Sequence, residues 1–183
     1  MENATTEFAV LFKFVGRLWQ QEVDLETVGG MNEAEFRQAF EALGGMVPAS
    51  TSEVIEQLAV EYCEVFVGPQ KAISPVQSIW ESNQFQSESS ASMNRFLDLI
   101  PGFTAGGGIV DHLGVQLAFV GVILDLDEVQ GRDILRLFFQ KHLSWQSQLL
   151  TAVESQQHSK FYSSLAVVTG KLISQLEIWI QEK

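Results

Sequence analysis

Two titratable residues, Asp111 and His112, stand together in the stretch GGGIVDHLGVQLAFVGVIL at residues 106–124. A carboxylate beside an imidazole can take part in acid–base or nucleophilic catalysis, bind a ligand, or stabilise a helix end. Hydrolysis would also need a nucleophile and an oxyanion hole, and the sequence contains no G-x-S-x-G motif. The one cysteine, Cys63, falls on the flank of a predicted amphipathic helix. The pair therefore favours capping or ligand binding, with a small hydrolase or nucleotide-binding enzyme as the alternative.

The sequence does not indicate a metal or phosphate site. The three histidines, His112, His142 and His158, lack the H-x-x-x-H and H-E-x-x-H spacings of zinc sites, so we expect no metal and no cofactor. Three glycines at residues 106–108 precede a helix, but no G-x-x-x-x-G-K-[ST] motif and no preceding strand accompany them. We interpret this glycine run as a hinge.

The composition predicts a soluble globular protein. The chain has 183 residues, of which 46% are hydrophobic and 19% charged, and this suits one domain with a sizeable core. Its N-terminus shows no signal-peptide pattern and its longest apolar run is too short to cross a bilayer, so we expect a cytoplasmic protein without direct membrane insertion. The net charge of −12 argues against a nucleic acid partner and favours a basic one, although solubility alone also accounts for such a charge.

Apolar residues recur at helical spacing along almost the whole chain, and strand patterns are nearly absent. We therefore predict an all-α, single-domain helical bundle over residues 1–183, with about seven or more helices. The helices are expected near residues 7–21, 32–43, 50–68, 89–100, 110–128, 132–154 and 159–181. Residues 113–124 are apolar nearly all round, so this helix should be central and buried, with Asp111 as its cap.

The predicted helix at residues 50–68 has an apolar face and an acidic face. We interpret the acidic face as a solvated surface, and it comprises Glu53, Glu56, Glu61 and Glu64. The next segment, GPQKAISPVQSIWES, is predicted to be a loop because it contains two prolines. Its Trp80 is either anchored in the core or in contact with a ligand.

Three segments, in order along the chain, resemble the signature motifs of the TorD/DmsD/NarJ family of cytoplasmic molybdoenzyme chaperones. Residues 62–69, YCEVFVGP, followed by Pro75 and by Ser78, Ile79 and Trp80, are similar to Y-x-x-L-F-x-G-P…P-x-x-S-V-W/Y. Residues 111–119, DHLGVQLAF, are similar to E-P-x-D-H-x-x-x-x-L-x-F/L-M, with Gly108-Ile109 in place of the usual Glu-Pro. A weaker similarity, to F-x-x-H-L-x-x-W, covers Phe139, His142, Leu143 and Trp145, with one residue fewer between the Leu and the Trp.

The resemblance implies an all-helical, non-enzymatic chaperone of the TorD-like type. It would bind the basic twin-arginine leader, or a leader-like N-terminus, of a molybdoenzyme catalytic subunit and hold that subunit until its cofactor is inserted. The candidate peptide-binding residues are Pro75, Ser78, Trp80, Asp111, His112 and Gln116, and the structural residues of the motif are Tyr62, Phe66, Gly68 and Pro69. Either a monomer or a helix-exchanged dimer fits the family. A general helical protein-interaction module is a further alternative.

A leader of this kind joins a basic segment to an apolar helix, so its site should combine an apolar groove with carboxylates. We predict that the groove is bounded by the loop at residues 75–80 and the hinge at residues 106–112. Trp80 would then supply apolar contact, and Asp111 with His112 would fix the polar geometry at the rim.

Overall fold

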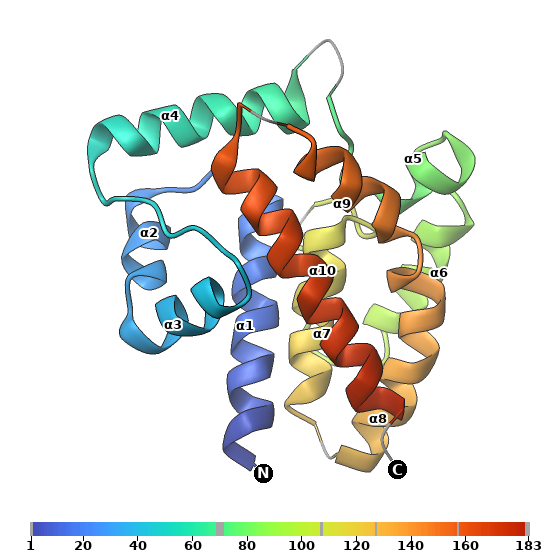
Figure 1. Cartoon of the computed structure of the whole chain (residues 1–183). Helices are drawn as coiled ribbons and strands as arrows, with labels where there is room; N and C mark the ends of the chain where they lie inside the picture. Colours follow the sequence, from blue (N-terminus) through green and yellow to red (C-terminus); the bar gives the residue numbers. More distant parts are fainter. Residues whose placement is uncertain (1, 69–71, 107, 127, 157, 182–183) are drawn as a thin grey trace. The chain divides into compact units, whose positions relative to one another are not determined.

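A computed structural model describes residues 2–68, 72–106, 108–126, 128–156 and 158–181. Over these ranges the chain forms ten α-helices and two π-helical segments, and it forms no strand (Figure 1). The all-α prediction is therefore confirmed. Pro69, predicted to be a structural residue of the motif, and Gly107, in the middle of the predicted hinge, lie outside the described residues.

The chain divides into two compact units, each built from segments that are distant in sequence. The first unit comprises residues 1–20, 75–146 and 176–183, and the second comprises residues 21–74 and 147–175. Pro75, Ser78, Trp80 and the Asp111–His112 pair all belong to the first unit. The single-domain organisation stays a prediction.

The first unit is built around a central helix. Its elements are α1 (Glu2–Gln20), α5 (Gln77–Ser82), α6 (Glu88–Leu97), α7 (Leu113–Leu124), α8 (Glu128–Phe138), the π-helical segment η2 (Phe139–Leu143) and the end of α10 (Lys160–Gln181). Nearly every residue of α7 is buried, as predicted for residues 113–124. The helix is shorter than the predicted 110–128, because its N-cap is His112 and its C-cap is Asp125.

Small residues allow the backbones of α1 and α7 to pack unusually close. A Cβ atom on Gly16 would lie 2.6 Å from the carbonyl oxygen of Gly114, and one on Gly121 would lie 2.6 Å from that of Ala9. Both helices therefore place a small residue at each of two contacts that are two turns apart. The two helices lie side by side (Figure 1). This packing fixes α7, and with it the residues at its N-terminus.

The second unit contains α2 (Leu25–Met31), α3 (Ala34–Ala42), α4 (Ser52–Tyr62), η1 (Cys63–Val67), most of α9 (Gln146–Glu154) and most of α10. Tyr62 and Phe66 pack against the ring of Tyr162, with centroids 5.8 and 5.3 Å from it. The backbone N–H of Gly68 donates to the carbonyl of Cys63 at 2.7 Å and closes η1. These contacts support a structural role for this part of the motif, which stays a prediction.

Glu61 is not part of a solvated acidic face. Its side chain is buried, and its two carboxylate oxygens accept hydrogen bonds from Ser159 Oγ at 2.9 Å and Gln57 Nε2 at 3.0 Å. The helical pattern placed Glu61 on the polar side of α4, but the turn before α10 covers that position. A hydroxyl and an amide satisfy the carboxylate there, as buried polar groups require.

The predicted helix over residues 132–154 is interrupted by η2. Side chains bind carbonyls that a continuous helix would use. Gln77 Nε2, from α5, donates to the carbonyl of Lys141 at 2.7 Å, and Trp145 Nε1, three residues further along the chain, donates to that of His142 at 3.0 Å. These donors satisfy the carbonyls and allow the chain to turn from α8 into α9.

Candidate functional site

A short antiparallel backbone pairing joins the two main motif segments. The N–H of Gln77 donates to the carbonyl of Asp111 at 3.0 Å, and the N–H of Leu113 donates to that of Pro75 at 2.8 Å. Val76 and His112 thereby form an isolated β-bridge. Because Gln77 and Leu113 are the first residues of α5 and α7, the pairing brings the starts of these two helices together.

Asp111 caps α5 and not α7, so the predicted cap is wrong. Its Oδ2 accepts from the backbone N–H of Ser78 in the first turn of α5 at 2.9 Å, and its Oδ1 accepts from Ser90 Oγ on α6 at 2.9 Å. The residue at the N-cap position of α5, Val76, has no side chain that can accept this bond. The backbone pairing places the Asp111 carboxylate over α5, where it supplies the missing acceptor.

His112 is the residue that caps α7. Its Nδ1 accepts a hydrogen bond from the N–H of Gly114 at 3.0 Å, so the proton of the neutral ring is on Nε2. Burial lowers the pKa of the imidazole to about 4, against an opposing effect of the Asp111 charge. At neutral pH this half-buried side chain is therefore an uncharged hydrogen-bond donor. Its capping bond occupies Nδ1, the atom through which a carboxylate orients a catalytic histidine.

A buried polar network joins all three motif segments. Gln77 Oε1 accepts from Gln116 Nε2 at 2.7 Å, and it accepts from His142 Nδ1 at 2.9 Å. Gln116 Oε1 in turn accepts from Trp145 Nε1 at 3.1 Å. Gln77 and Gln116 come from the first two motif segments, His142 and Trp145 come from the third, and all four side chains are buried. The network therefore ties α5, α7 and η2 into one body beneath the site.

His142 is held as one neutral tautomer. Its Nδ1–H donates to Gln77, its Nε2 accepts from Ser92 Oγ at 3.0 Å, and burial lowers its pKa to about 4. The ring packs against Phe96 of α6 and Phe138 of α8. Ser92, His142 and Gln77 have the connectivity of a nucleophile, a base and an orienting group, but all three are buried and none lines the cavity described next.

A cavity of about 740 Å³ opens beside Asp111. One wall is residues 108–111, and the other is residues 90–94 of α6 with the turn before that helix. The lining residues are Phe85, Gln86, Ser87, Ser90, Ala91, Asn94, Gly108, Ile109, Val110 and Asp111. Phe85 and Ile109, one on each wall, are 62% and 43% exposed, and we refer to them as the apolar rim of the cavity. The lining also includes the polar side chains of Gln86, Ser87 and Asn94. Its volume is within the usual range of ligand sites.

The structure brings together only some of the predicted site residues. Asp111 lines the cavity, as does the second half of the predicted hinge, residues 108–111. The other wall comes from residues 85–94 and not from residues 75–80, which become helical from Gln77 onward because Asp111 caps α5. Pro75, Ser78 and Gln116 are buried, while Trp80 is half-buried on α5 and is not a lining residue. Peptide contact by these residues stays a prediction.

Sequence reasoning missed the α6 wall and the polar network. It named one member of the network, Gln116, but as a peptide-binding residue. His142 and Trp145 carried a signal only through the weak third motif. Among the described residues, no group of three or more His, Cys, Asp or Glu side chains is placed to hold a metal ion. The described helices also include none that is long and apolar enough to span a membrane.

Comparisons with known proteins agree with this fold. The solved structure of a redox enzyme maturation protein from Archaeoglobus fulgidus matches at a TM-score of 0.60 with 19% identity, covering 94% of this chain and 93% of that chain. At this identity the likeness concerns the fold. No curated protein matches the sequence. A family model described as nitrate reductase delta subunit matches residues 31–151, most of the chain, and confirms the resemblance drawn from the motifs. The chain belongs to the nitrate reductase delta subunit family.

Proposed function

We propose that this chain is a cytoplasmic maturation chaperone that binds the basic twin-arginine leader, or a leader-like N-terminus, of a molybdoenzyme catalytic subunit. Family membership supports the maturation role, and the A. fulgidus structure of the same fold carries the name of a redox enzyme maturation protein. The observation that supports leader binding is the cavity between α6 and residues 108–111. In this role the protein holds its client until the cofactor is inserted.

The rim of the cavity suits the apolar part of such a leader. Phe85 and Ile109 expose large apolar side chains on its opposite walls. Exposed apolar side chains gathered at a concave site are typical of surfaces that bind an apolar helix or strand of a partner. Polar lining side chains such as Ser87 and Asn94 then provide hydrogen bonds to the peptide backbone.

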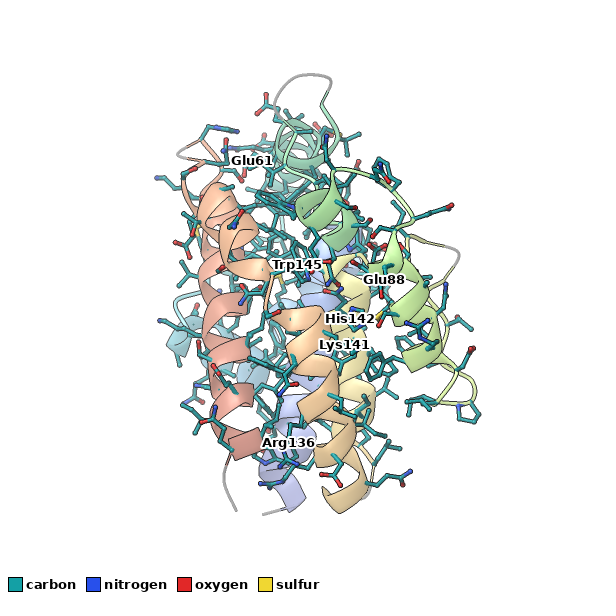
Figure 2. All side chains as sticks on the ribbon, turned by 90° about the vertical axis from the view of Figure 1, so that its right-hand side faces the viewer. Glu61, Glu88, Arg136, Lys141, His142 and Trp145 are labelled. Atoms are coloured by element: carbon teal, nitrogen blue, oxygen red, sulfur yellow. The ribbon has the colours of Figure 1, made fainter. Side chains whose placement is uncertain are left out.

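The charge of the protein suits the basic part of the leader. The net charge is −12, and the residues that line the cavity include no lysine or arginine. Glu88 opens α6 next to the lining residue Ser87 and is exposed, so it is available to a guanidinium (Figure 2). Opposite charge speeds the encounter and adds directional bonds at the arginines.

The direct test is titration of the protein with a synthetic peptide that carries two adjacent arginines followed by an apolar segment. We expect binding that weakens as the salt concentration rises, and binding about tenfold or more weaker when both arginines are replaced by glutamine. Isothermal calorimetry or fluorescence anisotropy measures both effects. If the peptide does not bind, or if the glutamine peptide binds equally well, leader recognition is the wrong function.

A substitution at the rim tests the place of binding. Ile109→Ser removes apolar contact area from the cavity, so we expect about tenfold weaker binding of the same peptide. Ile178→Ser is the matched control, because Ile178 is also exposed, at 60%, and does not line the cavity. Equal affinities of the two variants would place the peptide elsewhere. Circular dichroism confirms that both variants are folded.

A further inference from the structure

We infer that Asp111 governs leader binding as a positioning residue, which holds α5, α6 and the wall at residues 108–111 in place, and that it makes no contact with an arginine of the leader. The inference rests on the proposed function, because it concerns how the same cavity binds. In this view the Asp111 carboxylate supports the site, and exposed acidic side chains bind the guanidinium groups of the leader.

The carboxylate of Asp111 is already in use and out of reach. Each of its oxygens accepts one hydrogen bond at 2.9 Å, from Ser78 N–H and from Ser90 Oγ, and the residue has 0% of its surface exposed. A bidentate arginine needs both oxygens along their accessible edge. It would have to displace a capping bond of α5 and a bond to α6 to reach them. The Asp111 carboxylate therefore acts as a buried link between α5 and α6, and we call these two hydrogen bonds the tie.

The hydrogen bonds of Asp111 connect the wall at residues 108–111 to two helices, α5 and α6. Its carboxylate contacts α5 through Ser78 and α6 through Ser90, and its backbone carbonyl accepts from the N–H of Gln77 at 3.0 Å. Ser90 and Asp111 themselves line the cavity, as do the two residues before Asp111. The spacing between the two cavity walls therefore depends on the bond between Asp111 and Ser90.

The tie requires hydrogen-bonding atoms but not a charge. An asparagine at this position keeps an oxygen for the N–H of Ser78, and its amide N–H₂ can donate to Ser90 Oγ, because a hydroxyl both donates and accepts. Alanine keeps neither bond and leaves the buried N–H of Ser78 without an acceptor. A residue that pairs with arginine behaves differently, since asparagine removes the charge on which such a pair depends.

The test compares Asp111→Asn and Asp111→Ala by titration with the twin-arginine peptide at low and high salt. We expect Asp111→Asn to bind within about threefold of the wild type with the same salt dependence, and Asp111→Ala to bind about tenfold or more weakly. Hydrogen exchange at the Ser78 amide is the second readout, and it should be faster in Asp111→Ala alone. If Asp111→Asn loses affinity and part of the salt dependence while Ser78 stays protected, the carboxylate is an arginine contact and the inference is overturned.

A milder variant serves if Asp111→Ala does not fold. Ser90→Ala breaks the bond to α6 and keeps the charge, so we expect weaker peptide binding with unchanged salt dependence; wild-type affinity in this variant would overturn the inference. The outcome for the wild type separates the two hypotheses. Absence of any binding by the wild type overturns the proposed function and the inference with it, whereas wild-type binding that is lost in Asp111→Asn overturns the inference alone.

Discussion

Gly114→Val is expected to destabilise the protein by about 3 kcal/mol or more, and its thermal unfolding midpoint should fall accordingly. A Cβ on Gly114 would overlap the backbone carbonyl oxygen of Gly16, and it would lie 2.5 Å from Gln20 Cγ. The side chain of Gln20 can move, but the carbonyl belongs to α1 and cannot move without separating the two helices. Because α7 carries His112 at its N-terminus and Gln116 in the polar network, peptide binding should be lost together with stability.

The control for this prediction is a glycine in open surroundings. Gly29 lies within α2, and a Cβ there would meet nothing within 4 Å. Gly29→Ala should therefore leave stability unchanged or raise it by up to about 1 kcal/mol, since alanine is the better helix former. Urea unfolding followed by circular dichroism compares Gly114→Ala and Gly114→Val with this control. If Gly114→Ala is as stable as Gly29→Ala, α1 and α7 do not approach as closely as described.

The second large effect is a loss of stability in mild acid. His142 is neutral in the folded protein, where burial lowers its pKa to about 4, and it is protonated more readily in the unfolded chain, where its pKa is the usual 6.5. Below pH 6.5 the unfolded state therefore binds more protons, and the free energy of unfolding falls as the pH falls toward 4. Between pH 7 and pH 5 we expect His142 to account for a loss of about 2 kcal/mol. His112 adds a loss of the same sign.

Replacing His142 measures its contribution to the loss of stability in acid. His142→Gln should be less stable than the wild type at pH 7, because one side chain cannot meet both Gln77 and Ser92 as the ring does. Its stability should also depend less steeply on pH between 7 and 5. An equal slope in the wild type and His142→Gln, measured by urea unfolding at several pH values, would mean that His142 is not held neutral.

The central helix could be predicted from the sequence because its signal is local. Residues 113–124 are apolar in every direction, and only a buried position accommodates such a helix. The role of Asp111 could not be read in the same way. Next to an apolar run, an aspartate is typical of an N-cap, whereas here the run is capped by His112 and the carboxylate binds Ser78, which lies 33 residues away. A tertiary bond of this kind leaves no periodic pattern.

The cavity was only half predictable for a similar reason. The glycine-rich segment before Asp111 indicates an irregular backbone in the sequence, and the second half of that segment does form one wall of the cavity. The opposite wall comes from the turn at residues 85–87 and from residues 90–94 of α6, where, apart from Phe85, the lining side chains are small or polar and do not indicate a site. Trp80, the most conspicuous residue of its segment, lies on α5 because Asp111 caps that helix. A large aromatic residue is easy to single out in a sequence, but which residues form the walls of a cavity depends on how the helices pack in three dimensions.

The burial of the motif residues indicates that their role is structural. Gln77, Ser78, Asp111 and Gln116 are buried, and each forms a backbone or side-chain hydrogen bond to another segment. The spacing of the motifs is therefore explained by a polar core that holds α5, α6 and α7 beneath the cavity. We expect the leader to be recognised by exposed residues at the rim that lie outside the motif matches, such as Phe85 and Ile109.

The most direct test of the account is to map where a bound leader lies. A twin-arginine peptide with a benzophenone side chain in its apolar segment is irradiated with the protein, and the cross-linked residues are identified by mass spectrometry. We predict cross-links at Phe85, at Ile109 and along the first half of α6, and their loss when excess unmodified peptide is added. Cross-links that are displaced by the unmodified peptide but fall outside residues 85–94 and 108–111 would contradict the account.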